Sequence, residues 1–201
     1  MNLYAAKASV NERLVPLVDR LAAAGVTPDQ VTLAAIPVAV VGGACLWLSP
    51  GAPGLLLAVP VLVVVRILLN LVDGNMARRT GRIHPRGELF NELGDRLADI
   101  AFLAPVAWLP GAMAEVVLLG VLAGVLASYV GITARAAGGQ RIYRGILSKP
   151  GRMTLLVACS LWAFAAGPGA TTPWAAFGPI LLAGTVLTLV ERTAVAVRSL
   201  A

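Results

Sequence analysis

The chain has 201 residues, of which 58% are hydrophobic and 13% charged, and its mean hydropathy is +0.83. Soluble domains carry about 25% charged residues, so this composition argues against a soluble fold and predicts that lipid covers much of the apolar surface. The formal net charge is +6, and the basic residues stand beside apolar runs, which favours anionic lipid headgroups over nucleic acid as the partner.

Residues 1–24 are predicted to form an amphipathic helix on the membrane surface. Apolar residues from Leu3 to Leu21 recur at roughly helical spacing, with charged residues between them. Gly25 ends this segment. Thr27 and Pro28 then have the residue types of an N-cap and a first helical position, so a new helix is expected to begin here. Residues 25–201 are expected to form one transmembrane domain.

Six apolar runs are long enough to cross a hydrocarbon layer of about 30 Å. The expected fold is therefore an all-α integral membrane protein with six transmembrane helices after the surface helix. The runs are Val31 to Leu48, Leu55 to Leu71, Leu89 to Trp108, Glu115 to Thr133, Met153 to Ala166 and Trp174 to Val190.

The connections between these runs alternate in charge. Three are short, rich in Gly and Pro, and free of Lys and Arg: Ser49 to Gly54, Leu109 to Gly111, and Gly167 to Gly169. The others contain basic clusters, which the positive-inside rule places in the cytoplasm. A multi-pass protein of the cell membrane is expected, with both termini and the active site at the cytoplasmic face.

The stretch from Asn70 to Asp99 carries the candidate chemistry. Five of the ten acidic residues lie there, although the stretch includes the ends of two apolar runs. Ionisable groups at membrane depth cost about 2.5 kcal/mol or more each and usually mark function. Asn70 and Asp73 are three residues apart, and Asn91, Asp95 and Asp99 follow at intervals of four, so each set lines one helix face. The short loop between them predicts two antiparallel, neighbouring helices whose acid faces meet.

Carboxylate and amide oxygens gathered in one cavity are suitable ligands for Mg²⁺ or Mn²⁺. Two such ions could clamp a diphosphate and neutralise its developing charge. Gly74, Ala77 and Gly87 would let a polar headgroup approach the backbone, and Arg78 would pair with phosphate oxygens. An alternative reading of the acids is internal salt bridging between helices.

The motif Asn70-x-x-Asp73-Gly74-x-x-Ala77-Arg78, followed after eight residues by Gly87-x-x-x-Asn91-x-x-x-Asp95, resembles the signature of the CDP-alcohol phosphotransferases, also called CDP-alcohol phosphatidyltransferases. The resemblance extends to the surface helix, the Gly-Val-Thr-Pro start of the first span and the six spans. It implies transfer of a substituted phosphoryl group from a CDP-linked donor, such as CDP-diacylglycerol, to an alcohol, with release of CMP in phospholipid biosynthesis. The acceptor alcohol is left open.

The resemblance also implies roles for individual residues. The metal ligands would be Asn70, Asp73, Asn91 and Asp95, around two ions, with Asp95 as the base that deprotonates the acceptor. The CDP moiety would contact Asn70, Gly74, Ala77, Arg78 and Gly87. The family pattern has four aspartates, whereas asparagine stands here at the first and third positions, as in a variant branch. Metal affinity should therefore fall unless Glu92 and Asp99 help.

Three basic residues after the fourth run, Arg135, Lys149 and Arg152, have two readings: topogenic charge, or a pocket for a phosphate on the acceptor or a lipid headgroup. Arg66 and Arg96 are expected to pair with acids inside the protein. Small residues at Gly42-Gly43 and Gly120-x-x-x-Gly124 suit close helix packing and a homodimer.

Two other functions stay open on sequence alone. A catalytically silent relative would bind CDP-lipid or lipid headgroups as a membrane scaffold or partner. A small transporter would need its acids at mid-membrane, whereas these acids cluster near one end of the runs.

Overall fold

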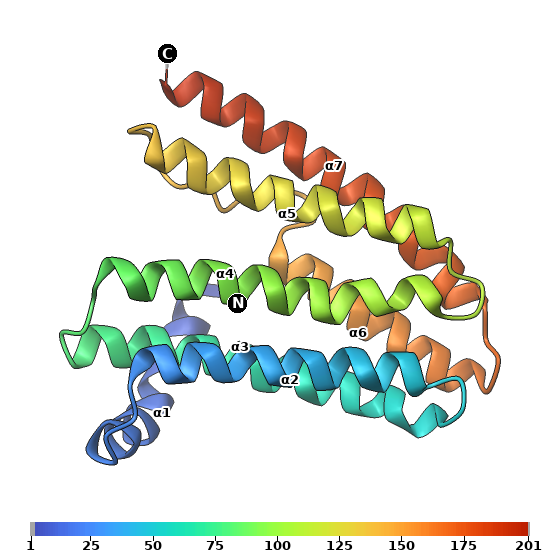
Figure 1. Cartoon of the computed structure of the whole chain (residues 1–201), viewed down its shortest axis with the longest axis horizontal. Coiled ribbons are helices and arrows are strands. Elements are labelled where there is room, and N and C mark those ends of the chain that lie inside the picture. Colours follow the sequence, from blue (N-terminus) through green and yellow to red (C-terminus); the bar gives the residue numbers. More distant parts are fainter. Residues whose placement is uncertain (1–2, 201) are drawn as a thin grey trace.

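The computed structural model describes residues 3–200, with their side chains from residue 12 onward. Within this range the chain is helical and has no β-strand (Figure 1). The elements are α1 (Leu3–Ala23), α2 (Pro28–Leu48), the 3₁₀ helix η1 (Pro53–Leu57), α3 (Ala58–Arg79), α4 (Pro85–Leu103), the 3₁₀ helix η2 (Ala104–Trp108), α5 (Ala114–Ala136), α6 (Lys149–Ala166) and α7 (Thr172–Leu200).

All six predicted runs lie in helical segments, and four of these are long and apolar enough to cross a membrane. They are Pro28–Leu48, Pro53–Arg79, Ala114–Ala136 and Thr172–Leu200. The other two, α4 and α6, are less apolar because α4 carries four acidic residues and α6 starts with Lys149 and Arg152. Large apolar side chains such as Trp47 and Leu122 face outward, as expected of lipid-covered helices. Six membrane crossings stay a prediction.

Helix α1 occupies the segment predicted to lie on the membrane surface. Val18 is fully buried and packs with Val72 and Met76 of α3, and Asp19 accepts two hydrogen bonds of 3.0 Å from Arg79. The side chains of residues 1–11, including Leu3, are outside the described part of the chain. Contact of α1 with lipid stays a prediction.

The start of α2 agrees with its sequence signals. Thr27 is the N-cap and Pro28 the first helical residue, as predicted. The Thr27 side chain accepts from the Gln30 backbone N–H at 3.3 Å, and Gln30 Oε1 accepts from the Thr27 N–H at 2.9 Å. This capping box satisfies two backbone donors and fixes the first turn of α2.

Helix α2 packs extensively against both α3 and α4. A Cβ atom at Gly43 would lie 2.1 Å from the Ala101 carbonyl oxygen, and one at Gly42 would lie 2.2 Å from the Phe102 ring, so glycine permits the approach of α2 to α4. The polar faces of α3 and α4 meet as predicted, because Arg66 and Asn70 of α3 donate hydrogen bonds to Asp95 of α4. Helix α2 makes the more extensive backbone approach to each of them.

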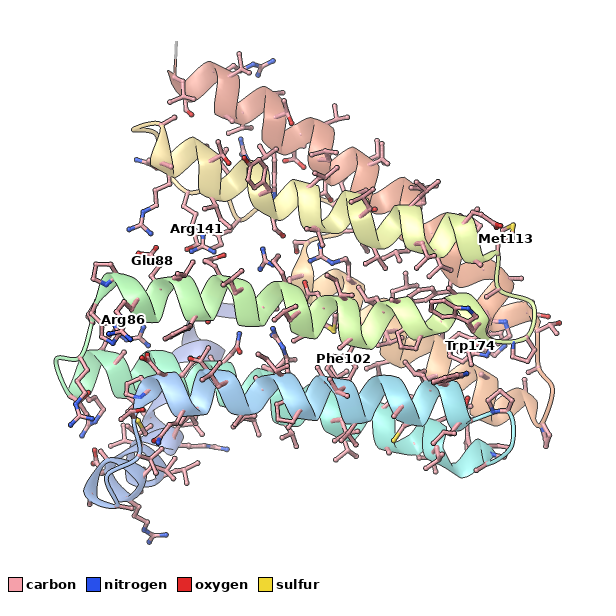
Figure 2. All side chains as sticks on the ribbon, viewed as in Figure 1. Arg86, Glu88, Phe102, Met113, Arg141 and Trp174 are labelled. Atoms are coloured by element: carbon pink, nitrogen blue, oxygen red, sulfur yellow. The ribbon has the colours of Figure 1, made fainter. Side chains whose placement is uncertain are left out.

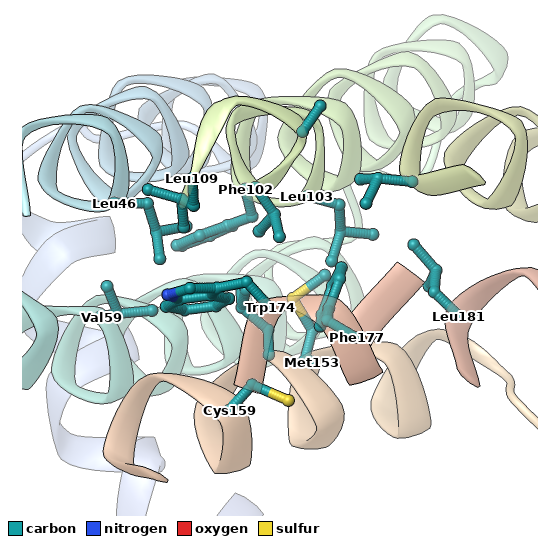
Figure 3. Packing of buried hydrophobic residues seen from close by; sticks show 14 of the residues in the cluster. Leu46, Val59, Phe102, Leu103, Leu109, Met153, Cys159, Trp174, Phe177 and Leu181 are labelled. Carbon is teal, nitrogen blue, oxygen red and sulfur yellow. The ribbon is translucent and has the colours of Figure 1, made fainter. Parts of the chain in front are cut away.

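The apolar core lies towards the end of the bundle that contains the Gly/Pro-rich connections. Phe102 and Leu103 of α4 pack there with Trp174 and Phe177 from the start of α7 (Figure 3). Cys159 is buried in the same cluster. This core stabilises the end of the bundle with the Gly/Pro-rich connections, and the polar residues of the motif lie towards the opposite end.

The loop after α5, residues 137–148, is fixed to the bundle by α7. The buried Arg192 guanidinium donates to the carbonyl oxygens of Ala127 at 2.9 Å, Tyr143 at 2.8 Å and Arg144 at 2.8 Å. Thr188 Oγ1 accepts from the Leu147 backbone N–H at 2.8 Å. These bonds hold the basic loop beside the first turn of α4.

Candidate active site

A pocket of about 440 Å³ opens at the end of the bundle where the basic connections lie. The first turn of α2, the end of α3, the start of α4 and the loop after α5 form its walls. Six predicted site residues line it: Asp73, Gly74, Ala77, Gly87, Asn91 and Arg135. Residues from both halves of the motif therefore share one cavity.

Asp73 is a buried carboxylate in this pocket. Its Oδ2 atom accepts a hydrogen bond of 2.7 Å from the Thr32 hydroxyl of α2. Thr32 also lines the pocket and lies one turn after Pro28, whose carbonyl oxygen is 3.1 Å from the same hydroxyl. A neutral donor on α2 thus sets the orientation of an acid on α3.

The two motif glycines keep the pocket wall open. A Cβ at Gly87 would lie 3.1 Å from Asp29 Oδ1, so a larger residue would crowd that carboxylate. At Gly74 the nearest side chain to a Cβ would be the Arg78 guanidinium at 3.5 Å. Arg78 thus folds over Gly74 beside the pocket, and its Nη2 donates to Asn75 at 3.1 Å.

His84 caps α4. Its Nδ1 accepts from the Gly87 backbone N–H at 2.9 Å, and its Nε2 lies 3.6 Å from Asp29 Oδ2. The ring therefore joins the first turn of α4 to the first turn of α2. Both turns border the pocket.

Asp95 lies deeper, between three helices. Its Oδ1 atom accepts from Arg66 Nη2 at 2.7 Å, Asn70 Nδ2 at 3.0 Å and Lys149 Nζ at 2.6 Å. Its Oδ2 atom is 3.5 Å from Arg96 Nη2. Asp95, Asn70 and Lys149 do not belong to the pocket lining. The contacts of Arg66 and Arg96 confirm that both pair with acids inside the protein.

The acids expected to help with metal binding are engaged elsewhere. Asp99 Oδ2 is 2.7 Å from Arg152 Nη2, and its Oδ1 is 4.0 Å from Arg66. Glu92 pairs with Arg141 and lies 4.0 Å from Arg96. Helix-to-helix salt bridging, the alternative reading of the acids, therefore accounts for Asp99, whereas Glu92 pairs with Arg141 of the loop after α5 and with Arg96 of its own helix.

The three basic candidates differ in position. Arg135 lines the pocket and pairs with Glu88. Lys149 contacts Asp95, and Arg152 is buried against Asp99. The structure adds Arg141, whose guanidinium lies 4.7 Å above the Tyr143 ring. Figure 2 shows Arg141 and Glu88 on opposite sides of the space between α5 and α4.

Sequence reasoning missed several lining residues outside the motif, among them Asp29, Thr32, Arg82, Arg141 and Tyr143. A signal existed for the first two. The N-cap at Thr27 starts α2 at the same end of the bundle as the acids, so its first turn had to lie near them. Arg141 and Tyr143 come from an irregular loop and gave no periodic pattern.

The residues in the pocket suit one divalent ion. Among residues 3–200, no three His, Cys, Asp or Glu side chains converge as a metal site made of those residue types requires. Mg²⁺, however, often uses only one or two carboxylates together with waters and substrate phosphates. The Asp73 carboxylate and the Asn91 amide provide such oxygens in one cavity.

Comparison with known proteins agrees with this geometry. The family model for CDP-alcohol phosphatidyltransferase matches residues 25–190. The chain belongs to this family. CDP-alcohol phosphatidyltransferases are transferases of phospholipid biosynthesis, which confirms the resemblance seen in the motif and the membrane helices.

Two CDP-alcohol phosphatidyltransferase relatives cover most of the chain. The inner membrane protein YnbA of Escherichia coli K12 is 32% identical over 165 residues, which are 82% of this chain and 80% of YnbA. The phosphatidylinositol phosphate synthase of Mycobacteroides abscessus is 30% identical over 183 residues, 88% of this chain and 80% of that enzyme.

Solved structures of the Mycobacterium tuberculosis phosphatidylinositol phosphate synthase share the fold. The manganese and citrate complex has a TM-score of 0.78 at 23% identity and covers 92% of this chain and 88% of its own. The CDP-DAG complex has a TM-score of 0.76 at 24% identity and covers 90% and 92%. Both comparisons show that the helices of this chain share the fold of that synthase.

Proposed function

We propose that this chain transfers a phosphatidyl or similar substituted phosphoryl group from a CDP-linked lipid, such as CDP-diacylglycerol, to an alcohol and releases CMP. The observation that carries this proposal is the meeting of Asp73, Gly74, Ala77, Gly87 and Asn91 in one pocket. Family membership and the CDP-DAG bound to the mycobacterial structure support it.

The proposed reaction is a single displacement at phosphorus. The acceptor oxygen forms a bond to the phosphorus on the lipid side of the diphosphate, and the bond from that phosphorus to the bridging oxygen breaks. CMP leaves with the bond electrons. Asp95 takes the hydroxyl proton through Oδ2, because its Oδ1 is occupied by three donors.

For the CDP moiety we propose the residues that border the pocket with little bulk. Gly74, Ala77 and Gly87 leave the backbone accessible, and Arg78 lies over Gly74 with its guanidinium. A guanidinium can bind two phosphate oxygens at once, which suits a diphosphate. Asn70 belongs to the same proposed set by its motif position.

The pocket is proposed to hold Mg²⁺ or Mn²⁺ through Asp73 and Asn91. When bound, a divalent ion neutralises charge on the diphosphate and on the departing CMP. The other two motif residues, Asn70 and Asp95, lie behind the pocket lining and contact each other. The manganese in the mycobacterial structure supports use of a divalent ion.

For the acceptor we propose an alcohol that carries an anionic group. Arg135 and Arg141 line the pocket, and each pairs with a single acid of α4 that an anion could replace. Lys149 and Arg152 are nearby but engaged by Asp95 and Asp99. Several relatives are named phosphatidylinositol phosphate synthases, which agrees with a phosphorylated acceptor.

The proposed setting is the cell membrane, crossed six times, with the pocket and both termini in the cytoplasm. The basic residues around the pocket entrance, among them Arg82 and Arg135, support this orientation. α1 is proposed to lie in the headgroup layer. A homodimer stays a prediction, because Gly42, Gly43, Gly120 and Gly124 all face contacts within this chain.

CMP release tests the proposal. The purified chain is incubated in nanodiscs with CDP-diacylglycerol, Mn²⁺ and one acceptor at a time: inositol phosphate, glycerol phosphate, inositol, glycerol or serine. We expect CMP only with a phosphorylated acceptor. Release with an uncharged alcohol alone would overturn the acceptor class and leave the reaction intact.

The alternative, a silent relative that binds CDP-lipid as a scaffold, predicts a different result. CDP-diacylglycerol would then bind in a calorimetric titration, but no acceptor would release CMP. A control with Arg78→Met should weaken that binding in either case, because the Arg78 guanidinium lies over Gly74, which lines the proposed donor site.

A further inference from the structure

Three donors from the protein saturate one oxygen of Asp95. Arg66 Nη2, Lys149 Nζ and Asn70 Nδ2 all lie within 3.0 Å of Oδ1. A carboxylate oxygen has about two lone-pair sites, so Oδ1 has none left for a metal. The donors come from α3 and α6, and the side chain of Asp95 is only 13% exposed. These contacts are therefore part of the packing between α3, α4 and α6.

The charges at this point also oppose a second cation. Arg66 and Lys149 bring two positive charges to the single negative charge of Asp95, and Arg96 is 3.5 Å from its other oxygen. At position 70, where the family signature has an aspartate, the amide donates to Asp95. A second divalent ion beside Asp95 would meet an amide N–H and positively charged side chains, whereas it needs oxygen ligands.

The pocket side of the motif is different. Asp73 is held by a neutral hydroxyl, that of Thr32, and it shares the cavity with Asn91. A carboxylate and an amide oxygen in one cavity can hold one Mg²⁺ or Mn²⁺ together with waters and substrate phosphates. The immediate partners of the two motif carboxylates therefore differ: a neutral hydroxyl at Asp73 and two cations at Asp95.

We propose that Arg66, Lys149 and the Asn70 amide take the place of one of the two divalent ions that the motif implies, so that this chain holds a single ion, at Asp73 and Asn91. Lys149 is then a positioning residue that supplies a fixed positive charge beside Asp95. The inference deepens the proposed function and rests on it for the presence of an ion.

Manganese stoichiometry tests the inference without requiring turnover. The full chain in nanodiscs of zwitterionic lipid is titrated with Mn²⁺, and free Mn²⁺ is measured by its EPR signal. We expect one Mn²⁺ per chain. Asp73→Asn should weaken this binding at least tenfold.

The combination of Lys149→Met and Asn70→Asp should create the second site. It removes the ammonium and restores a carboxylate, so two Mn²⁺ should bind and show mutual dipolar broadening. The matched control is Arg144→Met, which removes an exposed charge from the loop before α6 without touching Asp95. This control should keep one Mn²⁺.

Two coupled Mn²⁺ ions in the unsubstituted chain, or none, would overturn the inference. A single Mn²⁺ in the combined variant, with its fold intact by circular dichroism, would also overturn it. The CMP assay separates this failure from that of the proposed function: CMP release with two ions rejects only the inference, whereas one ion without CMP release rejects the enzyme.

Discussion

At the scale of single residues, the hydroxyl of Thr32 is the partner that fixes Asp73. Thr32→Val keeps the shape of the side chain but removes the donor. Because groups behind a metal ligand typically contribute 10-fold or more to metal affinity, we expect Mn²⁺ binding to weaken about tenfold. Titration with Mn²⁺ measures this. Thr32→Ser, which retains the hydroxyl, is the control and should bind almost as the unsubstituted chain does.

The proposed base makes a second prediction at this scale. Asp95→Asn leaves the size of the side chain unchanged but cannot accept the acceptor's proton. A general base contributes about 10²-fold or more, so CMP release should fall by at least that factor while CDP-lipid binding persists. Asp19→Asn changes an exposed ion pair with Arg79 and is the control. Unchanged turnover in Asp95→Asn would remove the assigned role.

Motif spacing predicted only part of the site. Asp73, Gly74 and Asn91 were expected to meet, and they line one pocket, whereas Asn70 and Asp95 lie outside its lining. The pairing of Arg66 with an internal acid was expected, but the contact of Lys149 with Asp95 was not, because Lys149 is far away in sequence and only the packing of α6 brings it close. Spacing along one helix contains no information on such contacts.

At the scale of helices, the contact between α2 and α4 depends on residues without side chains. Gly43→Ala would place a methyl group against the rigid carbonyl of Ala101, and overpacking of this kind costs about 1–3 kcal/mol. We expect a lower thermal midpoint in detergent. Gly54→Ala, where a Cβ would meet no atom within 4 Å, is the matched control and should leave the midpoint unchanged.

The three hydrogen bonds from Arg192 to backbone carbonyls, here called the Arg192 clamp, give a second prediction at the scale of helices. Arg192→Met would leave three backbone carbonyls without their charged donor, and such bonds contribute about 1.5–3 kcal/mol each. Residues 137–148 should then exchange amide hydrogens at least tenfold faster in mass spectrometry. Arg198→Met, an exposed change on the same helix, should not affect them. Equal exchange in both variants would contradict the clamp.

The positions of the helices along the chain could be predicted from the sequence, but the packing of α2 against both α3 and α4 could not. The capping residues Thr27 and Pro28 located the start of α2, because capping is a local property. That α2 would flank both α3 and α4 depends on the complementarity of Gly42 and Gly43 with Phe102 and Ala101, which lie far apart in the chain.

At the scale of the whole molecule, orientation in the membrane is open to a direct test. Ile83→Cys and Pro110→Cys flank α4, in a background in which Cys45 and Cys159 are alanine. An impermeant maleimide applied to intact cells should label Pro110→Cys and spare Ile83→Cys until the cells are permeabilised. Labelling of both positions in intact cells would show that α4 does not cross the membrane.

The two motif carboxylates, Asp73 and Asp95, have partners that lie far apart in the sequence. The hydroxyl that holds Asp73 belongs to α2, which the ribosome makes well before α6, the helix whose Lys149 ammonium contacts Asp95. During synthesis, Asp73 can therefore meet its partner while Asp95 still lacks Lys149. We expect the proposed activity to arise only late in translation, after the helix that starts at Lys149 has packed beside Asp95.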